Sequence, residues 1–262
     1  MNWKVALPMY NVSPRLQRGY ETLLERLLAD AGVRAELVAP SDLPAFWRRD
    51  DVLLTQTCGY PYVTMLADTV RLVATPCFDF PGCDGSDYSS LILARTASGV
   101  RELEQARGRV VAVNEAHSNS GMNVLRHAVA PLARDGRFFG EVKWSGSHVG
   151  SMRMLRAGEA DLAAIDCVTY GYLRAETPGF LCGTKVVGRS ASSPGLPLVA
   201  SRAVPDELVA ALRAALLSPS EALLTLMQEV RINAFEYRTD ADYERIRRLE
   251  AEAVAAGYPQ IA

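Results

Sequence analysis

The sequence NEAHSNSGMNVLRH, residues 114–127, decides the fold, because it reads as a polar loop between a strand and a helix. Before it, residues 109–113 (RVVAV) have the β-branched run typical of a buried parallel strand. After it, Met122, Leu125 and Val129 recur at helical spacing. A buried strand that leads through a short loop into a helix is the repeating unit of an α/β fold. We therefore expect helices packed on parallel strands.

The loop itself carries candidate ligand-binding groups. Ser118, Asn119 and Ser120 lie where the first backbone N–H groups of the predicted helix have no partner inside the helix. Hydroxyl and amide side chains favour this position and can also hydrogen-bond a ligand. Such a helix start is a candidate anion-binding site. The simpler alternative is that one serine only caps its own helix and that Gly121 permits the turn.

The chain begins with further α/β patterns. Strands are expected over residues 3–9, 35–38 and 51–55, and an amphipathic helix over residues 14–31. The third strand runs into Gln56 and Tyr60, and ligands bind at the carboxyl ends of strands in open α/β sheets. Tyr10 lies at the corner after the first strand. All three are candidate contacts, although a tyrosine at such a place more often packs at the rim.

Two stretches of low regularity interrupt this pattern. Residues 75–87 and 189–197 are rich in Pro, Gly and Ser, and they read as crossings between lobes. We expect one lobe of residues 1–86 plus 196–262 and a second lobe of residues 87–195. This is the layout of a hinged binding protein.

Three loops of the second lobe are expected to meet. Ser118–Ser120, the pair Ser147 and His148, and Asp166 each follow a predicted strand, and the carboxyl ends of parallel strands share one edge. Two of the loops open helices, whose dipoles and N–H groups suit a tetrahedral oxyanion. Asp166 could accept a hydrogen bond from a protonated anion or contact an amine. The alternative is that it caps the helix beginning near Cys167.

Composition limits the class of partner. The chain has 262 residues, 49% hydrophobic and 22% charged, with a net charge of −2 and no long basic run, so we expect neither nucleic acid nor a membrane surface as a partner. Five cysteines without a C-x-x-C pair argue against a disulfide framework and a metal site, although Cys77 and Cys83 could form a bridge. No cofactor is expected.

An enzyme is the rival class. Ser120, His148 and Asp166 could form a hydrolase triad, but the sequence has no G-x-S-x-G elbow around Ser120. The three histidines also lack the spacing of H-E-x-x-H metal sites. We therefore expect no catalysis.

Several segments together resemble the solute-binding component of phosphonate, phosphite and phosphate ABC transporters. The resemblance covers roughly residues 3–200 and is carried by these segments: Gln56–Pro61, Tyr88–Ser90, Asn114–Asn123, Gly146–His148 and Gly158–Asp166. The resemblance implies an α/β, two-lobe fold of the type II periplasmic binding proteins, with a hinge of two crossings. It also implies ligand contacts from these residues: Ser118, Asn119, Ser120, His148, Tyr88, Asp166 and Tyr60.

The resulting expectation is a monomeric receptor that binds a small tetrahedral oxyanion in the cleft between its lobes and delivers it to an ABC permease. Alternatives are a binding protein for another solute, such as a thiamine-precursor pyrimidine, or a cytoplasmic ligand sensor of the same fold. The resemblance implies a periplasmic location. Residues 1–9, MNWKVALPM, lack the pattern of an export signal, which implies the cytoplasm if Met1 is the native start.

Overall fold

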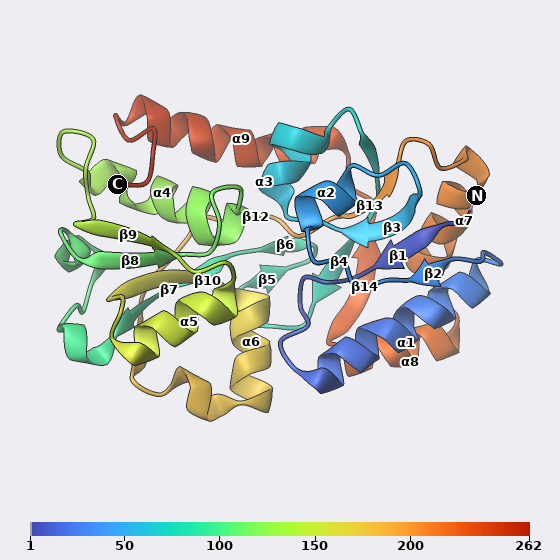
Figure 1. Ribbon diagram of the computed structural model, residues 1–262, viewed down its shortest axis with the longest axis horizontal. Coiled ribbons are helices and arrows are strands. Elements are labelled where there is room, and N and C mark those ends of the chain that lie inside the picture. The colour runs from blue at the N-terminus through green and yellow to red at the C-terminus, as the bar shows by residue number, and fades with distance from the viewer. Residues whose placement is uncertain (1) are drawn as a thin grey trace. The chain divides into compact units, whose positions relative to one another are not determined.

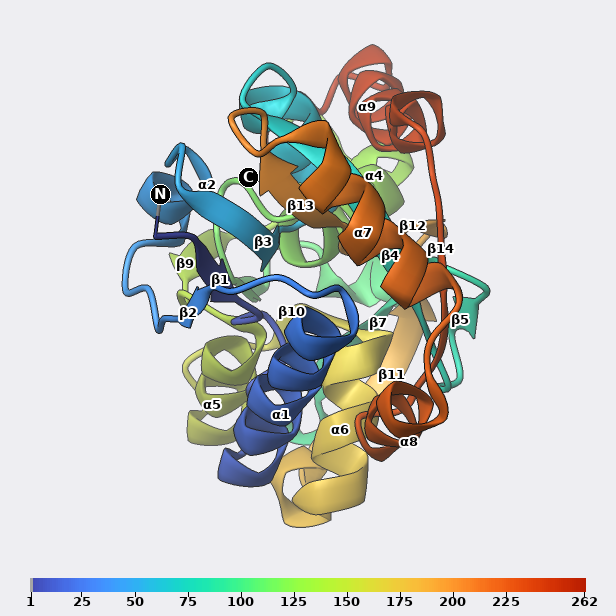
Figure 2. The same ribbon diagram turned by 90° about the vertical axis from the view of Figure 1, so that its right-hand side faces the viewer.

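A computed structural model describes residues 2–262 and divides the chain into two compact units. The first unit is the chain up to Asp87 together with Pro194–Tyr243, and the second is Tyr88–Ser193 together with Glu244–Ala262. Each unit contains its own sheet with helices packed on it (Figures 1 and 2).

The first unit is built on a six-stranded mixed sheet in the order β14-β4-β13-β3-β1-β2. Its strands are β1 (Lys4–Ala6), β2 (Glu36–Leu37), β3 (Val52–Gln56), β4 (Val70–Phe78), β13 (Leu198–Ser201) and β14 (Ile232–Glu236). β1 pairs in parallel with β2 and β3, whereas β13 and β14 run antiparallel to β4. The parallel strands expected near the N-terminus are therefore confirmed, and the antiparallel ones come from the later part of the chain.

Helices of the first unit follow the apolar pattern of the sequence. They are α1 (Pro14–Asp30), α2 (Leu43–Trp47), α3 (Gly59–Pro61) with the π-helical turn η1 (Tyr62–Leu66), α7 (Asp206–Leu217) and α8 (Glu221–Glu229). Ser13 caps α1 by accepting a hydrogen bond from Leu16 N, and the leucines of the expected apolar face are buried. α1 and α8 lie side by side (Figures 1 and 2).

The second unit contains a five-stranded sheet in the order β11-β7-β10-β8-β9. Its strands are β7 (Ser90–Arg95), β8 (Val110–Val113), β9 (Glu141–Trp144), β10 (Leu162–Asp166) and β11 (Thr184–Arg189). β8 pairs in parallel with both β9 and β10, and β7 runs antiparallel to β10 and β11. Three neighbouring strands, β9, β8 and β10, therefore end at the same edge, as expected.

The helices of the second unit cover both faces of this sheet. They are the π-helical turn η4 (Asn119–Asn123) with α4 (Val124–Val129), α5 (His148–Ala157), α6 (Cys167–Glu176) and most of α9 (Asp240–Ala255). Figure 1 shows α4 above the sheet and α5 and α6 below it. Short 3-10 turns are η2 (Thr96–Ser98), η3 (Leu103–Ala106), η5 (Ala130–Leu132) and η6 (Pro178–Leu181).

The crossings between the units differ from the expected pair. The chain passes between the units three times, after Asp87, after Ser193 and after Tyr243. The short strands β5 (Cys83–Asp84), β6 (Asp87–Tyr88) and β12 (Ser193–Pro194) lie at or near the first two passages. The first two passages lie at the two irregular stretches of the sequence. The third passage lies inside α9, where the helical pattern of the sequence continues without interruption.

The C-terminal segment accounts for the third passage. We expected residues 196–262 to belong entirely to the first lobe, but residues 244–262 belong to the second unit. Arg126 Nη1 donates to the Pro259 carbonyl at 2.8 Å, and Phe138 N donates to the Ala262 carbonyl at 2.8 Å. Figure 1 places the C-terminus beside α4. These hydrogen bonds join residues far apart in sequence, so no local pattern could reveal them.

Two further features concern the chain's environment. Among residues 2–262, no single helix has both the length and the hydropathy to cross a membrane. Only α7 and α8 taken together have the required length and hydropathy, and this pair is bent by 73°. The five cysteines are free thiols, so Cys77 and Cys83 are not bridged.

Candidate functional site

The turn that follows β8 is shaped by Ser118 and Gly121. Ser118 Oγ accepts a hydrogen bond from Gly121 N at 3.0 Å, and the Ser118 carbonyl accepts one from Asn123 N at 3.0 Å. The second bond spans five residues, so the turn is wider than an α-helical turn. A Cβ at Gly121 would collide with Asn114 Oδ1, which explains why the close approach needs glycine. Ser118 therefore caps this helix. The simpler alternative, in which one serine only caps the helix, is correct for Ser118.

Asn119 is fully buried and holds its neighbours in place. Its Nδ2 donates to Ser193 Oγ at 2.8 Å and to Tyr88 Oη at 3.5 Å. Its Oδ1 accepts from Asn123 Nδ2 at 3.1 Å. The amide of Asn119 therefore orients the buried Tyr88 hydroxyl, and it brings two expected site residues together.

Ser120, His148 and Asp166 form one cluster. Ser120 Oγ lies 2.8 Å from His148 Nε2, and the same nitrogen lies 3.3 Å from Asp166 Oδ2. Ser120 follows β8, His148 opens α5 after β9, and Asp166 ends β10. The three loops that the sequence placed at one edge are therefore in direct contact.

Ser147 and Asp166 both cap helices. Ser147 is exposed, and its Oγ accepts from Gly150 N at 3.0 Å at the start of α5. Asp166 Oδ1 accepts from Val168 N at 3.0 Å and Thr169 N at 2.8 Å at the start of α6. The capping alternative thus holds for one oxygen of Asp166, while its other oxygen faces His148.

The cluster has an unusual electrostatic balance. Burial lowers the pKa of His148, and the opposing charge of Asp166 only partly offsets this, so the imidazole is neutral near pH 7. Asp166 is 2% exposed. None of the described contacts of Ser120, His148 and Asp166 involves Lys or Arg. An anion here would be held by hydroxyl and backbone N–H donors.

The remaining expected site residues lie in the first unit. Gln56 is buried, and its Nε2 donates to the Leu196 carbonyl at 3.3 Å. The ring of Tyr10 packs edge-on against Phe78 with centroids 5.2 Å apart. Tyr60 is half-buried and follows Gly59 at the start of α3. Each of the three has a place in the first unit, and a role in ligand binding stays a prediction.

Several hydroxyl groups near the cluster escaped the sequence reasoning. Ser90 Oγ donates to the Ser120 carbonyl at 2.8 Å, and Ser190 Oγ accepts from Ser90 N at 2.8 Å. Ser193 supports Asn119. The sequence feature that could have revealed them is the series of serines within residues 189–197, which the sequence analysis interprets only as a crossing between lobes.

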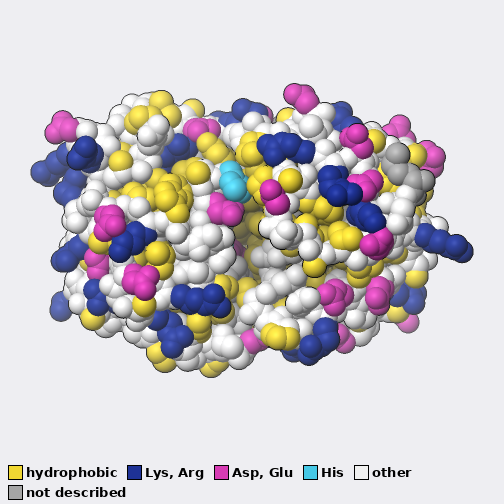
Figure 3. Space-filling view, in the orientation of Figure 1, with side chains coloured by type: hydrophobic (Ala, Val, Ile, Leu, Met, Phe, Trp, Pro, Cys, Tyr) yellow, Lys and Arg dark blue, Asp and Glu magenta, His cyan; other side chains and the backbone are white. Residues whose placement is uncertain are grey.

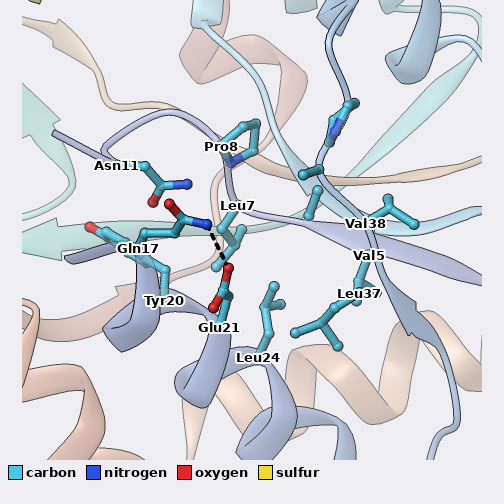
Figure 4. A pocket seen from close by; sticks show the side chains of 13 residues that line it. Val5, Leu7, Pro8, Asn11, Gln17, Tyr20, Glu21, Leu24, Leu37 and Val38 are labelled. Carbon is cyan, nitrogen blue, oxygen red and sulfur yellow. Dashed lines mark hydrogen bonds between the residues drawn. The ribbon is translucent and has the colours of Figure 1, made fainter. Parts of the chain in front are cut away.

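A separate pocket in the first unit suits an anion poorly. It has a volume of about 320 Å³ and lies among α1, β1 and the segment after β2 (Figure 4). Leu24, Leu37 and Val38 line it, and its polar groups include Gln17 and Glu21, which are hydrogen-bonded to each other at 2.9 Å. None of its lining residues is Lys, Arg or His. The carboxylate of Glu21 would repel an oxyanion.

Charge and metal-binding groups give no competing site. On the face shown in Figure 3, basic and acidic side chains are interspersed, in keeping with the net charge of −2. Within the described part of the chain, no three His, Cys, Asp or Glu side chains are grouped so that they could hold a metal ion.

Comparison with known proteins places the fold. No curated protein sequence matches this chain. The binding protein component of an ABC phosphonate transporter from Pseudomonas aeruginosa has a TM-score of 0.82 at 19% identity, over 97% of this chain and 87% of that chain. PhnD1 from Prochlorococcus marinus, in complex with methylphosphonate, has a TM-score of 0.81 at 12% identity, over 95% and 97%. XAC2383 from Xanthomonas citri, bound to ATP, has a TM-score of 0.71 at 17% identity, over 98% of each chain.

These similarities confirm the expected fold class, an α/β two-lobe fold of the type II periplasmic binding proteins. At the level of sequence, residues 5–243 match a family described as the periplasmic substrate-binding protein of phosphonate ABC transporters. Since the match spans most of the 262 residues, the chain belongs to this family of phosphonate-transporter substrate-binding proteins.

Proposed function

We propose that this protein binds the tetrahedral oxyanion of a phosphonate, phosphite or phosphate at the cluster of Ser120, His148 and Asp166. The observation that carries the proposal is the contact of Ser120 Oγ with His148 Nε2 at 2.8 Å, at the edge where β8, β9 and β10 end. Two helix starts, those of η4 and α5, add N–H donors and the positive ends of helix dipoles.

The same cluster argues against a hydrolase. In a Ser-His-Asp triad the serine and the aspartate bond opposite nitrogens of the imidazole, so that the aspartate fixes the tautomer in which the other nitrogen can take the serine proton. Here Ser120 and Asp166 both contact Nε2. Asp166 therefore does not hold the imidazole as the aspartate of a triad does, whereas a binding role needs no such arrangement.

The family suggests the partner and the place. Its members are periplasmic substrate-binding proteins of ABC transporters. We propose that this chain acts in the periplasm and delivers its ligand to an ABC permease. Which oxyanion it carries depends on groups around the cluster, and the comparisons with solved structures bear on the fold alone.

A thermal-shift screen tests the proposal. The panel contains phosphate, phosphite, methylphosphonate, 2-aminoethylphosphonate, sulfate, ATP and a thiamine-precursor pyrimidine. A ligand at about 100 times its dissociation constant stabilises the fold by about 2.7 kcal/mol, which corresponds to a rise of several degrees for a chain of this size. Stabilisation by a phosphorus oxyanion but not by sulfate or the pyrimidine supports the proposal. Stabilisation by the pyrimidine alone would replace it.

A further inference from the structure

The imidazole of His148 has two neutral forms, which differ in the nitrogen that carries the hydrogen. Nε2 lies 2.8 Å from Ser120 Oγ and 3.3 Å from Asp166 Oδ2. Nδ1 is buried and makes no hydrogen bond. The choice of nitrogen decides what Ser120 can offer to a ligand.

The carboxylate of Asp166 favours a hydrogen on Nε2. An ionised carboxylate only accepts hydrogen bonds, and Oδ1 already accepts two from the backbone of α6. Oδ2 is left facing His148. A bare Nε2 would set its lone pair against this anionic oxygen at 3.3 Å, in a site with little water to screen the repulsion. A protonated Nε2 turns the same contact into an attraction.

Other groups around the ring do not reverse this preference. The charge of Glu115 also raises the pKa of His148, by less than the charge of Asp166 does, and so favours a proton on the imidazole. The backbone of Ala164, a neutral acceptor near the ring, also raises the pKa of His148, by less than the charge of Asp166 does. Because an ionised carboxylate is a stronger hydrogen-bond acceptor than a neutral carbonyl, the hydrogen is favoured on the nitrogen that faces Asp166.

The form of the imidazole sets the direction of the Ser120 hydroxyl. If Nε2 carries the hydrogen, Ser120 Oγ accepts it, and the hydroxyl hydrogen is left for another acceptor. None of the described contacts of Ser120 provides that acceptor. If Nε2 were bare, Ser120 would donate to it and would turn only lone pairs outward, which repel an anion.

We propose that Asp166 is a positioning residue that holds neutral His148 with its hydrogen on Nε2, and thereby directs the Ser120 hydroxyl hydrogen toward the oxyanion. The ligand part of this inference rests on the proposed function. It assigns Asp166 a role through His148, instead of the direct choice between protonated and unprotonated ligands that we expected from the sequence.

The substitution Asp166→Asn separates this role from simple charge. The Asn side chain keeps an oxygen for the two backbone donors of α6, so the cap is retained. Its amide nitrogen then faces Nε2 and donates to it, which forces the hydrogen of His148 onto Nδ1. Asp161→Asn is the matched control, because Asp161 precedes the other end of β10 and pairs with Arg95 at 3.0 Å.

Long-range proton–nitrogen NMR spectra of the ligand-free protein at pH 7.5 read the form directly. The chain has three histidines, so His148→Gln assigns the His148 signals by their loss. We expect hydrogen on Nε2 in the parent and in Asp161→Asn, and on Nδ1 in Asp166→Asn. A parent spectrum with hydrogen on Nδ1, alone or on both nitrogens, would overturn the proposal.

Calorimetric titration with methylphosphonate gives the second readout. Asp166→Asn removes a negative charge beside an anion site, so Coulomb's law alone predicts tighter binding. Our proposal predicts binding at least about tenfold weaker, because Ser120 no longer donates. Equal or tighter binding by Asp166→Asn, with Asp161→Asn unchanged, would refute the positioning role. Failure of the parent to bind any oxyanion of the panel would instead refute the proposed function. The NMR spectra would still test the form of His148, because they need no ligand.

Discussion

At the scale of single residues, the candidate site combines neutral donors with one buried carboxylate. Ser120 can donate to an anion, His148 holds the Ser120 hydroxyl in place, and the carboxylate of Asp166 serves the backbone of α6 and the imidazole. A buried charge in such a place is costly unless it is hydrogen-bonded. Asp166 meets this requirement without a Lys or Arg partner.

The neutral imidazole of His148 makes stability depend on pH. Burial lowers its folded-state pKa below the ordinary value of about 6.5 that applies in the unfolded chain. Between the two values the unfolded chain binds more protons, so this contribution is complete above about pH 6.5 and is lost as the pH falls. We expect the parent to lose more stability than His148→Gln between pH 7.5 and 5.5, measured by urea unfolding. Equal losses would contradict a buried neutral imidazole.

At the scale of elements, the sequence predicted the strands of the second unit better than its helix starts. A buried strand was expected over residues 109–113 and another before Asp166, and β8 and β10 lie there. The helix expected after the loop of residues 114–120 instead begins with the π-helical turn η4. Its width depends on the approach of Asn114 to Gly121, a contact between side chain and backbone that periodicity cannot encode.

The Gly121 contact can be tested by one methyl group. Gly121→Ala should lower the free energy of unfolding by about 1–3 kcal/mol, because the new Cβ would collide with Asn114 Oδ1 and push the turn apart. Gly179→Ala is the control, since a Cβ there would meet no atom within 4 Å. Chemical denaturation of both variants measures the difference. If the two lose equal stability, the close approach does not shape η4.

At the scale of the whole molecule, the C-terminal segment was the part that the sequence misplaced. Its attachment to the second unit depends on Arg126, which is almost fully buried on α4. Arg126 Nη2 lies 2.7 Å from Asn123 Oδ1 and 3.2 Å from Glu250 Oε1, in addition to the Pro259 contact. A basic residue in a short amphipathic helix gives no hint of partners more than a hundred residues away.

Removal of this arginine should loosen the C-terminal segment. Arg126→Leu should cost about 2 kcal/mol of stability, because hydrogen bonds from a charged group to buried acceptors are lost. Arg153→Leu, at an exposed position on α5, is the matched control and should cost much less. Hydrogen exchange should then show faster exchange over residues 244–262 in Arg126→Leu alone. Unchanged exchange there would mean that other contacts hold the segment.

The two-lobe fold also predicts a response to ligand. Proteins of this architecture can close about a hinge, and the passages near residues 87 and 193 are the expected hinge segments. We expect small-angle scattering to show a smaller radius of gyration when a stabilising oxyanion from the thermal-shift panel is added. If a tightly bound ligand left the radius of gyration unchanged, the protein would not close about a hinge.

The central claim is that Ser120, oriented by His148, donates to an oxyanion, and calorimetric titration of methylphosphonate tests it most directly. Ser118, not Ser120, caps η4, so Ser120→Ala should leave the fold nearly as stable as the parent. Loss of one hydrogen bond to a charged group, about 1.5–3 kcal/mol, should weaken binding by roughly 10- to 150-fold. Ser218→Ala, at an exposed position of the first unit, should bind as the parent does. Equal affinity of Ser120→Ala and the parent would contradict the claim.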